Sequence, residues 1–174
     1  PISDHRSWIS EASGQLLASH LLAAAERGVK VRLLLDDFTV SSNPGAIESL
    51  DTHPNVEVRV FNPWASRGSR FGTAVEFLTR AKQLNRRMHN KTYIADNRFA
   101  IAGGRNIGDR YFGLFEPFVQ NDLDVLVAGA LVRDVTASFD RYWNSEHAFP
   151  ITSFRKPREI PADLAATESL LAAT

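Results

Sequence analysis

The chain has 174 residues, enough for one domain of ordinary size, and its formal net charge at pH 7 is zero. Its 44% hydrophobic and 23% charged residues are typical of a globular protein and exclude a disordered chain. The absence of cysteine excludes disulfides, thiolate chemistry and cysteine-based zinc sites. No apolar run approaches the roughly 20 residues that span a bilayer, so a lipid substrate would have to be met at the membrane surface.

The N-terminal part of the chain predicts helices alternating with strands, from apolar periodicity and from glycine and proline signals at the ends of segments. In chain order, these are a helix over 14–28, a buried strand over 29–35, a short helix over 44–50, an alternating strand over 55–61 and an amphipathic helix over 73–87. The aromatic and arginine-containing loop from Phe61 to Phe71 predicts either an interfacial membrane contact or ordinary packing.

The C-terminal part begins with two strands, "HNKTYIAD" and "FAIAGG", joined at the turn signal "DNR". After them come a strand over 122–129, a helix over 130–143, a proline-interrupted tail and a short helix over 163–173. Strands that alternate with helices predict an α/β fold with a mixed, mostly parallel sheet flanked by helices. We expect one domain over 1–149, with 150–174 as a tail or a connection to further chain.

One short stretch, "RRMHNKTYIADNRFAIAGGRN", concentrates the residues that could do chemistry. His89 and Lys91 are two apart, so on a strand both side chains point to the same face. A neutral imidazole can attack phosphorus, and an ammonium group can neutralise the phosphoryl oxygens. Asp96 has the opposite parity unless the strand ends or bulges first, and it is equally suited to forming the turn before Asn97.

The glycine pair after the second of these strands could let the backbone approach a ligand closely, or could serve only a turn. Asn106 could donate a hydrogen bond to the same phosphoryl oxygens. Upstream, the segment from Trp64 to Lys91 carries seven basic residues and one acid. That excess would attract an anionic substrate, unless it is only a solvated basic face.

The stretch resembles the HKD motif of the phospholipase D superfamily, H-x-K-x4-D followed by G-[GS]-x-N. Together with "GVKVRLLLDD", "NVEVRVFNP" and "DLDVLVAGALVRDVTASFDRYWN", it is similar to the N-terminal half of bacterial cardiolipin synthase-like proteins over most of residues 14–144. The resemblance implies a phospholipase D-like αβα sandwich. It also implies phosphatidyl transfer between phospholipids through a phosphohistidine, with no metal or other cofactor.

The resemblance also implies roles for individual residues. The catalytic residues would be His89 as nucleophile with Lys91, Asp96, Asn106 and Asp122, and the substrate-binding residues would be Gly103, Gly104, Arg105 and Asp124. Asp122 would orient the histidine through its other ring nitrogen, although it could instead be a strand-end cap or an ion-pair partner. Asp124, two residues on, has the same strand parity and is a second candidate for that role.

The family active site uses two HKD motifs, and this sequence carries one. The first strand of the family domain also looks cut off or altered at residues 1–8. We therefore expect a second HKD half, from the same gene product or from a homodimer partner. The expected substrate is a phosphatidylglycerol-like phospholipid, met by peripheral association with a bacterial membrane. The alternatives are a homodimeric phosphodiesterase or nuclease, although nucleic acid is the less favoured partner, and a catalytically silent module that binds anionic headgroups.

Overall fold

A computed structural model describes most of the chain. The residues described are 11–37, 40, 44–64, 88–114 and 120–153. Four predicted features lie outside them: the altered strand at 1–8, most of the aromatic and basic segment after Trp64, the helix over 73–87 and the helix over 163–173. No described helix is both long enough and apolar enough to cross a membrane.

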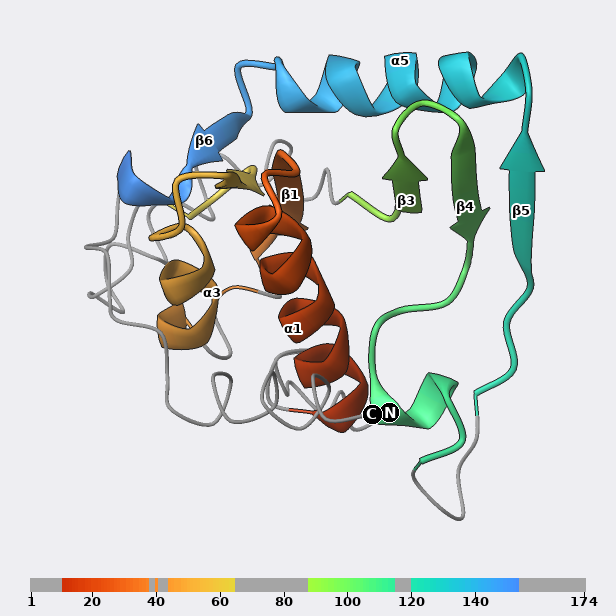
Figure 1. The fold of residues 1–174 in the computed structure, drawn as a ribbon, viewed down its shortest axis with the longest axis horizontal. Coiled ribbons are helices and arrows are strands. Elements are labelled where there is room, and N and C mark those ends of the chain that lie inside the picture. The colour runs from red at the N-terminus through yellow and green to blue at the C-terminus, as the bar shows by residue number, and fades with distance from the viewer. Residues whose placement is uncertain (1–10, 38–39, 41–43, 65–87, 115–119, 154–174) are drawn as a thin grey trace, which may run out of the picture.

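The described elements follow the predicted order closely (Figure 1). They are α1 (Ala12–Glu26), β1 (Val31–Asp36), α3 (Pro44–Leu50), β2 (Val56–Phe61), β3 (Lys91–Ala95), β4 (Phe99–Gly103), the 3-10 turn η2 (Asp109–Tyr111), β5 (Asp124–Ala128), α5 (Leu131–Trp143), β6 (Ala148–Pro150) and η3 (Ile151–Ser153). The α/β class with flanking helices is confirmed. Strand β6 and the two 3-10 turns were not predicted.

The first sheet has the order β1-β2-β6 and contains the main hydrophobic core. β1 and β2 pair in parallel, with Val31 opposite Val56, and β6 adds to β2 antiparallel. Branched side chains of both strands pack with α1 and α3 because these helices present apolar residues at helical spacing. Ile151, just after β6, is buried in the same cluster. The chain therefore continues to pack on this sheet beyond α5.

The second sheet is an antiparallel meander in the order β3-β4-β5. Its first hairpin turns at Asp96 and Asn97, which have φ values of 52° and 55°, and the Arg98 amide donates to the Ala95 carbonyl at 2.9 Å. Two successive left-handed residues are the shape of a type I′ turn, which asparagine and aspartate tolerate better than most residues. Among the described strands one pairing is parallel and three are antiparallel, so the predicted predominance of parallel neighbours is not found.

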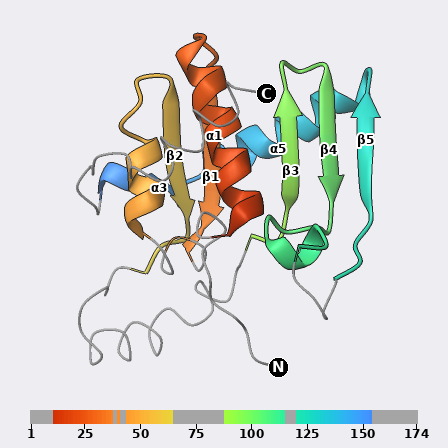
Figure 2. The same ribbon diagram turned by 60° about the horizontal axis from the view of Figure 1, so that its bottom comes forward.

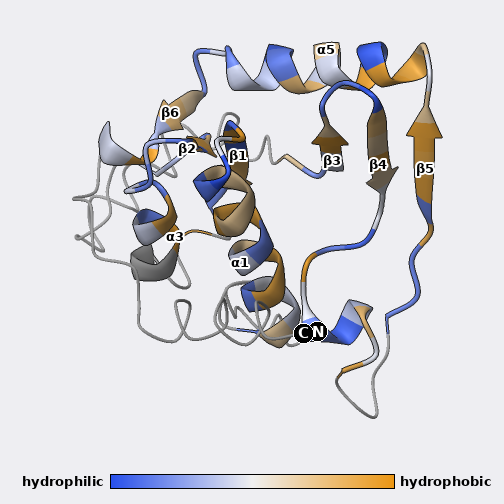
Figure 3. Cartoon of the chain, in the orientation of Figure 1, coloured by the Kyte–Doolittle hydropathy of each residue, from blue (hydrophilic) through white to orange (hydrophobic). Residues whose placement is uncertain are grey.

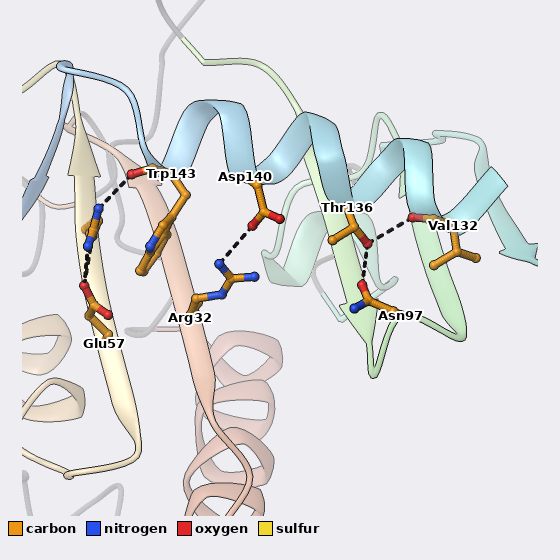
Figure 4. Close-up of polar contacts among 8 residues, drawn as sticks. Arg32, Glu57, Asn97, Val132, Thr136, Asp140 and Trp143 are labelled. Carbon is orange, nitrogen blue, oxygen red and sulfur yellow. Dashed lines mark hydrogen bonds and ion pairs between the residues drawn. The ribbon is translucent and has the colours of Figure 1, made fainter. Parts of the chain in front are cut away.

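Helix α5 runs along both sheets and links them (Figures 1 and 2). Its N-terminal half packs on the second sheet, where Val132 is buried and the Thr136 hydroxyl donates to Asn97 Oδ1 at 2.7 Å. Its C-terminal half reaches the first sheet, where Asp140 pairs with Arg32 at 2.9 Å (Figure 4). The same helix therefore fixes the hairpin turn of one sheet and the strands of the other.

Trp143, at the end of α5, is the main anchor of this link. It is 4% exposed and stacks on Phe139 with ring centroids 5.6 Å apart. The guanidinium groups of Arg32 and Arg59 lie 5.4 and 4.5 Å from the centre of its ring, within cation–π range. The Trp143 carbonyl also accepts a hydrogen bond from Arg59 at 2.8 Å.

We expect Trp143→Ala to lower the free energy of unfolding by about 3–5 kcal/mol, because it removes a buried aromatic ring and two cation–π contacts. Urea denaturation followed by circular dichroism measures the change. Arg141→Ala, an exposed position on the same helix, is the control and should shift stability by less than about 0.5 kcal/mol. Equal stability of the two variants would contradict the anchoring role.

Candidate active site

Most of the predicted site residues gather at one edge of the second sheet. β3 begins at Lys91, β4 ends at Gly103 and β5 begins at Asp124, and the register places these three residues in one row across the sheet. Paired residues in a sheet point to the same face, so the Lys91 and Asp124 side chains share a face, with a glycine between them. This edge is the lower end of β3, β4 and β5 in Figure 1.

His89 lies just before β3 and is exposed to solvent, while Lys91 is half-buried. The Lys91 ammonium donates a hydrogen bond to the His89 carbonyl at 2.9 Å. This contact folds the lysine back along its own strand and keeps its charge beside the histidine. The bond reaches the backbone of His89, so the shared face of the two side chains stays a prediction from their spacing.

The two glycines lie where a Cβ would collide with the segment from Asp122 to Asp124, at Gly103 with the Leu123 carbonyl (2.6 Å) and Asp124 Cα (2.8 Å) as well as with a carboxylate. A Cβ at Gly103 would come within 2.0 Å of Asp124 Oδ1, and a Cβ at Gly104 within 2.2 Å of Asp122 Oδ1. Neither glycine has a left-handed backbone. The pair therefore makes room for side chains of the neighbouring strand and is not needed to form a turn.

Arg105 is held by the same acidic segment. Its amide donates to Asp124 Oδ1 at 3.3 Å, and its guanidinium donates to the Asp122 carbonyl at 3.3 Å. Arg105 Nε lies 3.2 Å from Asp124 Oδ2, close enough for an ion pair, although its N–H does not point at that oxygen. The predicted substrate-binding arginine is thus paired with Asp124 in the structure.

Asn106 follows Arg105, and its side-chain amide donates to the Tyr111 hydroxyl at 2.7 Å. Tyr111 was not among the predicted site residues. It lies five residues beyond Asn106 in the run "GGRNIGDRYF", and nothing in the spacing alone indicates that this loop folds back on itself.

Asp96 lies away from the other site residues. It forms the β3–β4 turn, whereas His89 precedes the opposite end of β3. Seven residues of extended chain separate the two positions by roughly 20 Å. The structure therefore gives Asp96 the turn position that the sequence left open and does not bring its carboxylate to the histidine.

The carboxylates expected to orient the histidine lie at the same end of the second sheet, two strands away from β3. Among the described residues, neither Asp122 nor Asp124 hydrogen bonds to the His89 ring. A different carboxylate contacts the backbone just before His89. Asp36, at the end of β1, accepts a hydrogen bond from the Met88 amide at 3.2 Å. The signal for it was its position at the carboxyl end of a strand, where sites in α/β folds gather.

The face of the second sheet that carries Lys91 and Asp124 is open and apolar. The next row on this face, two residues along each strand, pairs Tyr93 with Ile101 and Ile101 with Leu126. These side chains are 49%, 43% and 69% exposed. Phe99, on the same face, is 52% exposed. The opposite face packs against α5 around Ala100, which is 1% exposed, whereas Val125 on that face, nearer the site, is 53% exposed. Figure 3 shows the apolar character of these three strands.

Exposed apolar surface of this extent, next to a polar edge, is typical of an interaction surface. In a folded protein, a sheet with one bare apolar face usually packs against a further layer or meets a partner.

Comparison with known proteins identifies the family of the chain. Residues 6–143 match the family described as "Cardiolipin synthase, PLD-like domain". Cardiolipin synthase C of Escherichia coli (strain K12) is 46% identical over 144 residues, which are 83% of this chain and 30% of the relative. A protein of Helicobacter pylori (strain ATCC 700392 / 26695) without a functional name is 41% identical over 87% of the chain and 30% of its own length.

A more distant relative is Cardiolipin synthase A of Pseudomonas syringae pv. syringae (strain B728a), 32% identical over 86% of the chain and 29% of its own length. The chain thus spans less than a third of the length of these three relatives. The match covers the strands that carry the sheet edge, the glycine pair and the histidine. On this evidence the chain belongs to the cardiolipin synthase, phospholipase D-like domain family.

Proposed function

We propose that this chain is one half of a phosphatidyl-transferring enzyme in which His89 forms a phosphohistidine intermediate. The observation that carries the proposal is the row of Lys91, Gly103 and Asp124 at the sheet edge, with His89 exposed beside it. A nucleophile accessible to solvent and a cation held within two residues of it suit a phosphodiester that arrives from outside.

In the proposed first step, one imidazole nitrogen of His89 attacks the phosphorus of a glycerophospholipid. The bond from phosphorus to the headgroup oxygen breaks, and the departing alcohol takes a proton from an acid. In the second step, a lipid hydroxyl loses its proton to that group and attacks phosphorus. The phosphorus–nitrogen bond then breaks and His89 is restored.

The neighbouring side chains stabilise charge in both steps. Lys91 and Asn106 would contact the phosphoryl oxygens as the negative charge on them changes in the transition state. Asp122 would orient the imidazole, with Asp124 as the second candidate, and either would have to approach the ring when substrate binds. Asp96 would act on the site only indirectly, by setting the hairpin register of β3 and β4.

The proposed reaction needs a second PLD-like half. Leaving-group protonation requires an acid in addition to the nucleophile, and the site edge presents one histidine among its described residues. The open face formed by Tyr93, Phe99, Ile101 and Leu126 adjoins this edge and is the surface that we assign to the second half. That half would come from the same gene product or from another copy of the chain.

The surroundings of the site favour lipid over nucleic acid as substrate. A groove for nucleic acid would present unpaired basic side chains and stacking aromatics along a polar path. Here the described arginine at the site, Arg105, is paired with Asp124, and the adjoining sheet face is apolar. We therefore also propose peripheral association of the enzyme with a lipid surface.

Phosphatidylglycerol vesicles test the proposal. We expect the chain, completed by its second half, to release glycerol and to produce a lipid with two phosphates, measured by thin-layer chromatography and mass spectrometry. A single-stranded oligonucleotide serves as the competing substrate. Preferential cleavage of the oligonucleotide would favour a nuclease. Vesicle binding without turnover by the completed protein would favour a headgroup-binding module.

A further inference from the structure

The segment between β4 and η2 is fastened at both ends. At its start, Arg105 is tied to Asp124 through its amide and its guanidinium group. At its end, Asp109 accepts hydrogen bonds from the Ser13 and Ala12 amides at 2.8 and 3.3 Å, at the first turn of α1. Glu11 completes this contact by accepting from the Asp109 amide at 2.7 Å. Asn106 therefore lies on a short bridge between the second sheet and α1.

The Asp109 anchor is a charged one. Burial alone would raise the pKa of this carboxyl, but hydrogen bonds from Ser13 and Ala12 outweigh it and lower the pKa below its usual range. Its ionised form suits the positive end of a helix. The ionised Asp109 therefore stabilises the folded state, in full above the ordinary pKa of 3.8. This stabilisation is lost as the pH falls through the lowered pKa of the folded state. Near neutral pH the anchor is intact.

The contact between Asn106 and Tyr111 determines how the amide of Asn106 is oriented. A side-chain amide has two N–H donors on one nitrogen, and the Tyr111 hydroxyl accepts from one of them at 2.7 Å. Because the amide is planar, occupying one donor fixes the direction of the other. Tyr111 itself is held by its own amide, which donates to the Gly108 carbonyl at 2.9 Å. Among the described residues, Asn106 makes no other side-chain hydrogen bond.

We propose that Tyr111 is a positioning residue that orients the Asn106 amide toward a phosphoryl oxygen, on a segment that Asp109 fastens to α1. This inference rests on the proposed function, because it takes Asn106 to contact the phosphoryl group. It assigns a role to the loop after the glycine pair: the loop presents one N–H in a fixed direction and keeps it there before the ligand arrives. Such preorganisation spares the site the cost of ordering the amide during the reaction.

Titration of the chain with inorganic phosphate, followed by amide chemical shifts in NMR spectra, tests this role without requiring turnover. We expect Tyr111→Phe to weaken phosphate binding about threefold to tenfold, the effect of one lost hydrogen bond. In an Asn106→Ala background, Tyr111→Phe should have no further effect, because the amide it orients is gone. Tyr142→Phe, a half-buried tyrosine beside Phe61 on the first sheet, is the matched control and should bind like the unaltered chain.

Asp109→Asn provides a second variant that leaves the Tyr111 ring in place. It should also weaken phosphate binding, and again only when Asn106 is present. The inference is wrong if Tyr111→Phe binds phosphate as tightly as the unaltered chain. It is equally wrong if the loss is the same in both backgrounds, since the tyrosine would then act independently of Asn106.

Lys91→Ala separates a failure of this inference from a failure of the proposed function. Phosphate binding that is lost in Lys91→Ala but unchanged in Tyr111→Phe would overturn the positioning role alone. A chain that binds no phosphate, or binds it equally well without Lys91, would overturn the proposed phosphoryl site and this inference with it.

Discussion

His89→Ala should abolish phosphodiester turnover by the completed enzyme while leaving the fold intact. The side chain is exposed and contributes nothing to the buried core, so its removal opens no cavity. Its loss removes the atom that is proposed to bond to phosphorus, and the described part of the sheet edge has no second histidine. The measurement is the initial rate with a chromogenic phosphodiester, alongside a thermal melt.

Trapping the covalent intermediate tests the same assignment directly. When a reaction with a slowly turned-over substrate is quenched, an acid-labile phosphoryl adduct should remain on His89, and mass spectrometry of peptides locates it. His20→Ala is the control, because this histidine is exposed on α1, away from the sheet edge, and its removal should leave the rate unchanged. Turnover that survives in His89→Ala, or a label on another histidine, would rule out the assignment.

The second large effect concerns completeness. A monomer of this chain should turn over phosphodiesters about 10²–10⁴-fold more slowly than the completed enzyme, because it lacks the acid that protonates the leaving alcohol. The measurement is specific activity as a function of protein concentration, with the mass in solution determined at each concentration. In a two-fold dimer the two His89 side chains should flank one phosphate, and activity per chain should rise as dimer forms.

Mixing distinguishes the two sources of the second half. If copies of this chain pair, an excess of His89→Ala protein should suppress the activity of unaltered chains, because each mixed dimer contains only one His89. If the second half comes from other residues of the same gene product, the variant should have no effect, and only the added half should restore the rate. Rapid turnover by a proven monomer would contradict the need for a second half altogether.

Local sequence patterns predicted most of the elements because the relevant signals are short-ranged. Apolar periodicity and flanking glycine and proline signals gave α1, α3, α5 and the five strands β1 to β5 to within about two residues. The shared face of His89 and Lys91 stays a prediction, drawn from the alternation of side chains on extended backbone. The role of the glycine pair at the site stays a prediction, and in the structure both glycines lie against the segment from Asp122 to Asp124.

Pairing between distant segments could not be read from the same patterns. The division into two sheets and the return of β6 to β2 depend on contacts between residues far apart in sequence. The bond from Asn106 to Tyr111 depends on how one loop folds, which spacing does not determine. Asp96 matched both the HKD motif and a turn signal, so the sequence allowed a catalytic role and a turn role. Only the position of the hairpin in the structure distinguishes the two.

The hydrophobic core is unevenly distributed, and this affects the part of the protein that carries the site. The main buried cluster is formed by residues of α1, β1, α3 and β2 with Val40 and Ile151, and includes none from β3, β4 or β5. Segments with few buried apolar contacts open locally at a lower free energy than global unfolding, so amide hydrogens of the second sheet should exchange faster than those of the first. Whatever binds the open face adds its own binding free energy to the closed form. In the proposed enzyme, the rigidity of this sheet edge would then be acquired only when the second half or the substrate is in place.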